Sequence, residues 1–434
     1  MFANKNIVKK VLIPAVLLLI IIIALTVHTC WSRGDSSSVG EKEKEEIQID
    51  ENLRHTIDSF VTKTPAIGKV GLMVYDATAQ KEVYSLNEDS LMSPASCMKL
   101  LTSVATLKKL GRANVHKTRL YVSGKVEDGT LNGDVTLKTQ FDPFFNCDSL
   151  YKLTEALNTM GIKKIEGKVV LDMAVYTRMD HEEHWTIGDL RTRYLGLPLS
   201  GGAKLRTEMI YALSRLGIKV KKDDIVYGRL RYSKSKQIGE IRTPLCRSIN
   251  KALKNSSNIN AEALLYPLGY TKNKNGNFRN NGCLSLRDFV EKELKMDADA
   301  SCRIEDGCGL CPDDKLTARL LVNLLNYVYK KKNMFREVNN GLPTSGIDGT
   351  LYDRLYAPSV KGKIKAKTGT LTREGGVSSL AGYFYTEDGH LIIFAILNNQ
   401  CPVMDGRWWQ DKLLSRLCEI SKTKKGNPSW VSHF

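Results

Sequence analysis

The clearest apolar pattern of the chain lies between Ser93 and Gly111. Apolar residues recur there at the three- and four-residue spacing of a helix with a buried face. A serine and a proline at the start suit the N-cap and the first helical position, and the glycine suits a stop. The pattern therefore predicts a buried helix that starts at Ser93-Pro94. Its apolar positions are Leu100, Leu101, Val104, Ala105 and Leu107.

Alternating or continuous apolar runs predict strands on both sides of this helix. Runs at 68–75 and 82–86 flank a polar turn and predict a hairpin before it. Asp388-Gly389 predicts a second hairpin turn near the C-terminus. The strands of that later group are expected at 361–371, 377–385 and 390–398, and helices at 47–64, 149–160, 245–253, from 260 onward, 316–329 and 408–421.

The stretch from residue 117 to residue 242 carries a helix and strand-like runs of its own. We therefore predict an inserted α+β lobe at 117–242, within a main domain formed by residues 47–116 and 243–425. A chain of 434 residues is long enough for two or three domains and a sizeable core.

The N-terminus has the pattern of an export segment. Three lysines in the first ten residues precede an apolar run from Val11 to Val27. We interpret residues 1–30 as a signal anchor or signal peptide and residues 31–46 as a polar tether. An uncleaved anchor is our first interpretation and a lipoprotein modified at Cys30 the second, with a cleaved signal as a third. The rest of the chain is then expected outside the cytoplasm.

Composition narrows the expected partners. The hydrophobic content of 42% is typical of a folded protein, and the formal net charge is +17. The lysines are scattered along the chain, and we see no zinc-finger spacing or RNA-binding motif, so we expect no nucleic-acid partner. An anionic envelope surface or a carboxylate-bearing substrate fits the charge.

Cysteines and histidines do not predict a metal site. The close pair Cys308-Gly-Leu-Cys311 favours small buried residues in a turn over a zinc half-site or a redox pair. Disulfides among Cys302, Cys308 and Cys311 stay open outside the cytoplasm. His181-Glu-Glu-His184 lacks the His-Glu-x-x-His spacing and is interpreted as a solvated turn. We expect neither a metal nor another cofactor.

Ser96 and Lys99 lie three residues apart near the start of the buried helix, so they share a face. A serine hydroxyl needs a base to act as a nucleophile at neutral pH. A lysine can be that base when burial or nearby cations disfavour its charged form. Taken alone the pair is a weak signal, and a capped helix with an exposed lysine is the simpler interpretation.

Two later motifs reverse that judgement. Ser256-Ser257-Asn258 falls in an expected loop between two helices, and Lys367-Thr368-Gly369 falls in an expected strand. Ser-x-x-Lys, Ser-x-Asn and Lys-Thr-Gly in this order form the motif set of penicillin-binding proteins and class A β-lactamases.

The residues around the motifs resemble the class C low-molecular-mass penicillin-binding proteins, the D-alanyl-D-alanine carboxypeptidase/endopeptidases of the penicillin-binding protein four type. The resemblance covers about residues 65–400. It implies an α/β (α+β) chain with a β-lactamase/transpeptidase-like serine hydrolase fold, in which helices flank an antiparallel sheet, plus an inserted lobe. The matching stretches are Ser93-Pro-Ala-Ser96-x-x-Lys99, Asn255-Ser256-Ser257-Asn258-x-x-Ala261-Glu262, Asp306-Gly-x-Gly-Leu310, Gly346-x-Asp-Gly-Thr350 and Lys367-Thr-Gly-Thr-Leu371.

Three positions depart from the family pattern. The middle residue of the second motif is Ser257, where the family often has aspartate. Cys308 and Cys311 stand at familiar serine positions. None of these changes removes a catalytic group.

Motif and resemblance together imply four catalytic residues. Ser96 attacks the carbonyl of the penultimate D-alanine, and Lys99 accepts its proton. Ser256 relays a proton to the leaving amine, and Asn258 holds Lys99 or the substrate amide.

The third motif is expected to bind substrate through Lys367, Thr368, Gly369 and Thr370. Lys367 is expected to keep Lys99 partly neutral, because a nearby like charge depresses a lysine pKa. Thr368 is expected to bind the terminal carboxylate. The backbone N–H groups of Ser96 and Thr370 are expected to form the oxyanion hole.

The expected function is that of a serine D-Ala-D-Ala carboxypeptidase/endopeptidase. It acts on peptidoglycan stem peptides through an acyl-enzyme, and β-lactams inhibit it covalently. Two alternatives stay open, a β-lactamase and a non-catalytic penicillin-binding wall module. We expect the protein in the cell envelope, either anchored on the periplasmic side of the cytoplasmic membrane or present as a lipoprotein.

Overall fold

The computed structural model describes residues 51–179, 185, 195–373 and 375–420. All of the described residues belong to one compact unit, Gln48–Phe434. The predicted export segment and tether and the His181-Glu-Glu-His184 turn lie outside the described residues. Within the described residues, no helix combines the length and the apolar character that a membrane crossing needs.

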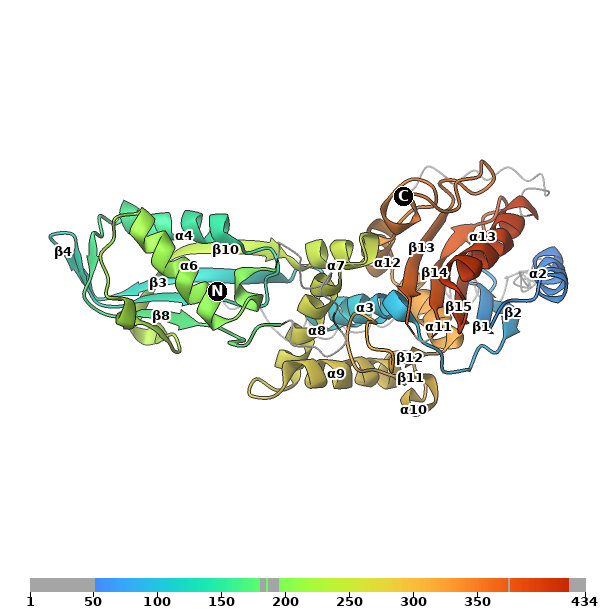
Figure 1. The fold of residues 1–434 in the computed structure, drawn as a ribbon, viewed down its shortest axis with the longest axis horizontal. Helices are drawn as coiled ribbons and strands as arrows, with labels where there is room; N and C mark the ends of the chain where they lie inside the picture. The colour runs from blue at the N-terminus through green and yellow to red at the C-terminus, as the bar shows by residue number, and fades with distance from the viewer. Residues whose placement is uncertain (1–50, 180–184, 186–194, 374, 421–434) are drawn as a thin grey trace, which may run out of the picture. The chain divides into compact units, whose positions relative to one another are not determined.

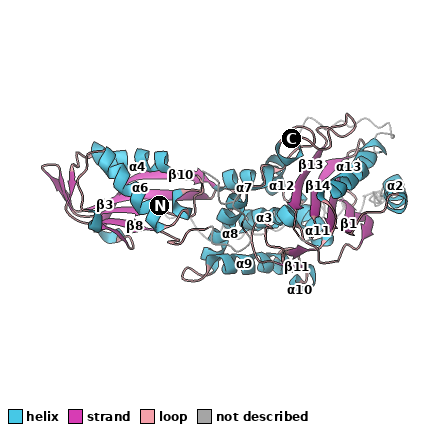
Figure 2. Cartoon of the chain, in the orientation of Figure 1, coloured by secondary structure: helices cyan, strands magenta, loops and turns pink. Residues whose placement is uncertain are grey.

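The main sheet has five strands in the order β13-β14-β15-β1-β2, and all neighbours are antiparallel (Figures 1 and 2). It joins both ends of the described chain, because β1 pairs with β15. The predicted antiparallel sheet flanked by helices is confirmed. Its strands are β1 (Lys69–Asp76), β2 (Lys81–Leu86), β13 (Ile364–Leu371), β14 (Val377–Tyr385) and β15 (Leu391–Asn399).

Side-chain alternation along β15 divides the core into two layers. Ile393 and Leu397 pack with the helices on one face, and Phe394 and Ile396 pack with those on the other. Strands buried on both faces read as continuous apolar runs, as β15 does. The first layer contains α3 (Met98–Leu110), α7 (Leu245–Lys254), α8 (Asn258–Lys272), α9 (Phe278–Lys292) and α11 (Ala318–Tyr329). The second contains α2 (Glu51–Lys63) and α13 (Val403–Ile420).

A second five-stranded sheet, in the order β10-β3-β6-β8-β9, lies within residues 115–244 and has a separate hydrophobic core (Figure 1). The chain enters it along β3 and leaves it along β10, which pair antiparallel over their length. The predicted lobe boundaries at 117 and 242 stay a prediction. The elements here are β3 (Val115–Ser123), β6 (Val135–Lys138), α4 (Cys147–Thr159), β8 (Val169–Asp172), α6 (Gly202–Arg215), β9 (Ile225–Tyr227) and β10 (Ser235–Pro244).

Short elements complete the described chain. A three-stranded sheet contains β4 (Lys125–Glu127), β5 (Thr130–Asn132) and β7 (Lys164–Ile165), and a two-stranded one contains β11 (Cys302–Arg303) and β12 (Lys315–Leu316). The short helices are η1 (Ala95–Cys97), η2 (Leu197–Leu199), η3 (Lys222–Asp224), η4 (Tyr232–Lys234), α10 (Ala298–Ser301), α12 (Lys332–Gly341) and η5 (Gly349–Leu351).

The predicted start of the buried helix was wrong in one detail. Ser93 does not cap it, because the chain first forms the 3-10 turn η1, whose cap position is Pro94. Ala95 has a φ of 44°, in the left-handed region, which separates Ser93 from the helix. Instead the backbone of Ser93 is held by the amide of Asn399, at 2.7 and 3.0 Å. The predicted stop at Gly111 is confirmed.

Candidate active site

Ser96 lies in the turn η1, and Lys99 lies in the first turn of α3. Lys99 Nζ is 2.8 Å from Ser96 Oγ, so the predicted pair is in hydrogen-bonding contact. Ala95, directly before the serine, holds the left-handed φ of 44°. Backbone strain of this kind is found most often at functional sites, where the surrounding structure has to hold it.

Lys99 connects the first motif to two other segments. Its side chain is fully buried. The ammonium nitrogen lies 2.7 Å from Asn258 Oδ1 and 2.5 Å from the carbonyl oxygen of Cys308. These contacts fix the amine beside the serine hydroxyl and complete the expected link between Lys99 and Asn258.

Asn258 lies in a helix, which corrects the expected loop. It is the first residue of α8, and Ser257 is the N-cap, whose hydroxyl accepts from the backbone N–H and side-chain amide of Asn260. A serine in this position is a favourable cap because it satisfies an otherwise unpaired helical N–H. Ser257 therefore has a structural use at the position where the family often has aspartate.

Ser256 contacts the third motif. Its backbone has a left-handed φ of 57°, and its Oγ accepts a 2.9 Å hydrogen bond from Lys367 Nζ. Lys367 also donates to the carbonyl of Thr368 at 2.7 Å and is fully buried. The structure thus brings Ser96, Lys99 and Asn258 into one hydrogen-bonded group and Ser256 and Lys367 into a second one, and the charge of Lys99 acts on Lys367.

The electrostatics of this group centre on Lys367. Burial, and then the nearby charge of Lys99, lower the pKa of Lys367 from 10.5 to about 7. Repulsion between two like charges is mutual, so the expected effect of Lys367 on Lys99 agrees with this shift and stays a prediction. A site with two close amines at neutral pH favours a state in which one of them has lost its proton.

The rest of the third motif lies along β13, the edge strand of the main sheet. Thr368 Oγ1 and Thr350 Oγ1 are 2.7 Å apart, and Thr370 Oγ1 accepts from Arg407 Nη2 at 3.1 Å. Gly369 has no space for a side chain, because a Cβ there would lie 2.5 Å from the carbonyl oxygen of Pro94. The glycine thus lets β13 approach the turn that carries the nucleophile.

A glycine-rich turn supplies the Cys308 carbonyl that accepts from Lys99 Nζ. The carboxylate of Asp306 accepts hydrogen bonds from four successive backbone N–H groups, at 2.5 to 3.1 Å. This ring of contacts orients the carbonyl of Cys308 toward Lys99. The donors are the N–H groups of Cys308, Gly309, Leu310 and Cys311.

Sequence reasoning missed three participants, Thr350, Arg407 and the Cys308 carbonyl. Thr350 and Cys308 lie in two stretches that match the family, Gly346-x-Asp-Gly-Thr350 and Asp306-Gly-x-Gly-Leu310. These matches marked the two residues as part of the family pattern but gave them no role in the site. The sequence offered no comparable signal for Arg407.

Glu262, Asp306 and Cys308 form a buried cluster of potential metal ligands. Its carboxylates already accept backbone hydrogen bonds, since Glu262 Oε1 binds the N–H of Gly307 at 2.9 Å and Asp306 binds the turn. The cluster is therefore best explained as support for the turn. Among the described residues, the cysteines, including Cys302, Cys308 and Cys311, are thiols that form no disulfide with one another.

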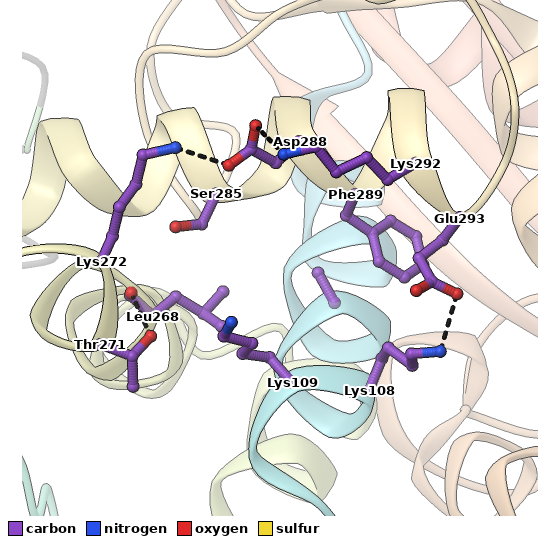
Figure 3. Close-up of a pocket in the computed structure, with 11 residues that line it drawn as sticks. Lys108, Lys109, Leu268, Thr271, Lys272, Ser285, Asp288, Phe289, Lys292 and Glu293 are labelled. Carbon is purple, nitrogen blue, oxygen red and sulfur yellow. Dashed lines mark hydrogen bonds and ion pairs between the residues drawn. The ribbon is translucent and has the colours of Figure 1, made fainter.

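A pocket of about 360 Å³ lies at the other end of α3, between it and the helices α8 and α9 (Figure 3). Ion pairs cross its rim, between Lys108 and Glu293 at 2.8 Å and between Lys272 and Asp288 at 2.5 Å. Its lining includes none of the eight predicted site residues. The pocket is thus separate from the candidate active site.

Residues 53–201 and 200–417 match the model of the D-Ala-D-Ala carboxypeptidase 3 (S13) family. The chain belongs to this family. Its relatives include D-alanyl-D-alanine carboxypeptidase DacB of Haemophilus influenzae, 21% identical over 424 residues that cover 78% of this chain and 87% of the relative. A carboxypeptidase of Mycobacterium tuberculosis is 23% identical over 388 residues, which cover 83% and 82%.

Solved structures show the same fold. Penicillin binding protein 4 from Haemophilus influenzae aligns with a TM-score of 0.71 at 19% identity, over 86% of this chain and 100% of that chain. A predatory endopeptidase of Bdellovibrio bacteriovorus, acylated by penicillin G, aligns with a TM-score of 0.56 at 18% identity, over 83% and 96%. This S13 chain is a serine D-Ala-D-Ala carboxypeptidase, as its motifs predicted.

Proposed function

We propose that Ser96 is the residue this carboxypeptidase acylates, and that its substrates are peptidoglycan stem peptides ending in D-Ala-D-Ala. The observation that carries the proposal is the contact of 2.8 Å between Lys99 Nζ and Ser96 Oγ in a fully buried lysine. A serine becomes a nucleophile when an adjacent base takes its proton. The relatives' names supply the peptide class, D-alanyl-D-alanine.

In the acylation step, neutral Lys99 takes the proton of Ser96 as the serine oxygen attacks the carbonyl of the penultimate D-alanine. Asn258 and the Cys308 carbonyl hold the amine in place, since each lies within 2.7 Å of Nζ. The oxyanion is assigned to the backbone N–H groups of Ser96 and Thr370. In other acyl-transfer enzymes, each such donor contributes about 3–4 kcal/mol.

Departure of the terminal D-alanine needs a proton on its nitrogen, and Ser256 is positioned to give one. When Lys367 is protonated it donates to Ser256 Oγ. A hydroxyl has one proton, and because its oxygen is then accepting, that proton is available to the leaving amine, while Lys367 passes its own proton to Ser256 Oγ to replace it. Water afterwards hydrolyses the acyl-enzyme and restores Ser96.

β-Lactams are assigned as covalent inhibitors through the same serine. The Bdellovibrio endopeptidase, which shares the fold, was solved with penicillin G attached. Endopeptidase cleavage of D-alanyl cross-links uses the same acyl-enzyme with a different leaving amine. A β-lactamase differs from this in the rate at which water releases the penicilloyl group, and a wall-binding module differs in forming no acyl-enzyme.

We place the enzyme in the cell envelope, on the periplasmic side of the cytoplasmic membrane. The proposal rests on the basic and apolar N-terminal pattern, with an uncleaved anchor first and a lipoprotein at Cys30 second. We also propose that residues 117–242 form the inserted lobe, which shapes substrate access without carrying chemistry. The second sheet and its own hydrophobic core support that division.

The test is incubation of purified protein with defined monomeric and cross-linked muropeptides, read by mass spectrometry, with Ser96→Ala as the matched control. We expect loss of the terminal D-alanine from pentapeptide stems. Release of monomers from cross-linked dimers reports the endopeptidase activity. Unchanged muropeptides with the parent protein would overturn the proposed function.

A further inference from the structure

Arg407 contacts the site from an unexpected direction. It lies in α13, on the face of the main sheet opposite α3, and its Nη2 donates to Thr370 Oγ1 at 3.1 Å. The preceding Gly406 lets α13 lie close to β14, because a Cβ there would be 2.8 Å from the Cβ of Ser378. This close packing lets the guanidinium reach past β14 to the edge strand β13.

The carboxylate of Asp411 is paired with Arg354 rather than with Arg407. Asp411 binds the neighbouring Arg354 through both of its oxygens, at 2.6 and 3.3 Å. Burial and the charge of Arg354 lower the pKa of Arg407, and Asp411 opposes them. Within the described residues, the buried Nε of Arg407 has no hydrogen-bond partner. A second anion at this edge of the sheet is therefore electrostatically favourable.

The contact also fixes the proton of Thr370. An arginine can only donate, so Thr370 Oγ1 is the acceptor and its own O–H remains available to donate. Thr368 and Thr370 are two residues apart on one strand and therefore share a face. Thr350 adds a third hydroxyl, 2.7 Å from that of Thr368. The edge of β13 thus presents hydroxyl donors backed by a cation.

We propose that Arg407 is a positioning residue that makes the enzyme select a leaving group with a free carboxylate. The inference rests on the proposed function, in which the leaving group is a terminal D-alanine. Its carboxylate is held by the hydroxyl of Thr368, as expected from the motif, by the hydroxyl of Thr370, which Arg407 orients, and by the positive charge behind them. A leaving group that ends in a neutral amide gains none of these interactions.

Two activated substrates test this, an acyl-D-alanyl thioester of thioglycolate and the same ester of thioglycolamide. The thioester makes both cleavable even where the carboxylate contributes nothing. Since charge-assisted hydrogen bonds are about twice as strong as neutral ones, Arg407→Gln should lower kcat/KM for the thioglycolate by about 10- to 100-fold. The loss should appear mainly in KM, because the carboxylate is bound before and during the reaction. The thioglycolamide should change by less than about threefold.

Arg416→Gln is the matched control, because Arg416 lies on the same helix with its guanidinium 5.0 Å from the ring of Phe60. Arg416→Gln should leave the ratio of kcat/KM for the thioglycolate to kcat/KM for the thioglycolamide unchanged. Arg407→Lys keeps the charge and should restore part of the selectivity. Thr370→Val should reduce it as Arg407→Gln does, and the double variant should lose little more than either single one.

The inference would be overturned if Arg407→Gln lowered kcat/KM equally for both substrates. It would also be overturned if Arg416→Gln changed the ratio of the two kcat/KM values as much as Arg407→Gln does. If Arg407→Gln does not fold, Arg407→Lys and Thr370→Val carry the test, and an unchanged ratio in Thr370→Val contradicts it. Ser96→Ala separates the two levels of the account. If Ser96→Ala cleaves both substrates as the parent enzyme does, the proposed function itself is rejected. If Ser96→Ala loses this cleavage, the proposed function stands, and the Arg407 variants alone decide the inference.

Discussion

The two ends of α3 place their lysines in different surroundings, one buried beside a second amine and one exposed beside a carboxylate. Lys99 lies in its first turn and Lys108 in its last, nine residues and about 14 Å apart along the axis. At the exposed end, a hydrogen bond to Glu293 raises the pKa of Lys108. At the buried end, the charge of Lys99 adds to burial in lowering the pKa of its neighbour Lys367 to about 7.

The comparison indicates that neighbours and burial, rather than residue type, distinguish the lysines to which we assign a catalytic role. A lysine paired with a carboxylate at the surface stays charged and contributes little beyond solubility and about 0–1 kcal/mol of stability. Two buried amines that face hydroxyl and carbonyl oxygens cannot both hold a proton easily. Such a pair can accept and return protons at neutral pH, as an acyl-enzyme mechanism requires.

The largest expected effect comes from replacing the base with a cation that cannot lose its proton. Lys99→Arg should lower the acylation rate by several orders of magnitude, because arginine stays protonated in proteins. Lys367→Arg should lower it less, since Lys367 supplies a charge and a hydrogen bond rather than the base. Stopped-flow acylation with a chromogenic β-lactam measures both. Similar mild losses in the two variants would mean that Lys99 is not the base.

The second effect is the pH dependence of acylation in the parent enzyme. One amine of the pair has to be neutral, so the rate should rise with pH through about 7 and fall about tenfold per unit well below it. The apparent pKa belongs to the coupled pair of Lys99 and Lys367. A rate that does not change between about pH 5 and 9 contradicts a titrating amine as the base.

A smaller effect concerns stability. Folding lowers the pKa of Lys367 from 10.5 to about 7. Between these values the unfolded chain binds more protons than the folded one, so this group makes the folded state more stable as pH rises. The destabilising contribution of Lys367 is complete below about pH 7. Lys367→Met should therefore raise the melting temperature most at low pH and progressively less toward pH 10.

Lys108→Met is the matched control for that measurement, because it also replaces a lysine by methionine, but at the exposed end of α3, away from Lys99 and Lys367. Its pKa is raised rather than lowered, and an exposed pair contributes about 0–1 kcal/mol. The variant should melt at nearly the parent temperature or slightly below it. A larger gain in stability for Lys108→Met than for Lys367→Met at pH 6 refutes the contrast between the two ends.

Much of the fold was predictable from periodicity. The strand β14 has the predicted bounds, and the helix α7 extends one residue beyond its predicted end. The helix α13 begins at Val403, five residues before the predicted Trp408, because its first turn is mostly polar or exposed and carries no apolar stripe. Arg407 fell outside the predicted helix for that reason.

The candidate catalytic side chains could be named from their motifs, but their surroundings could not. Lys99 and the Cys308 carbonyl are 209 positions apart in the sequence, and a backbone acceptor leaves no mark on residue type. The same holds for the pairing of Thr370 with Arg407, which depends on the close approach of α13 to β14. Local patterns determine elements, whereas long-range contacts of this kind depend on how those elements pack.

The most direct measurement of the central claim is the site of the covalent adduct. The protein is incubated with benzylpenicillin, its intact mass is determined, and the modified peptide is sequenced by tandem mass spectrometry. The account predicts a single penicilloyl group on Ser96, absent from Ser96→Ala and formed much more slowly in Lys99→Arg. An adduct on another residue, or one that persists in Ser96→Ala, would contradict it.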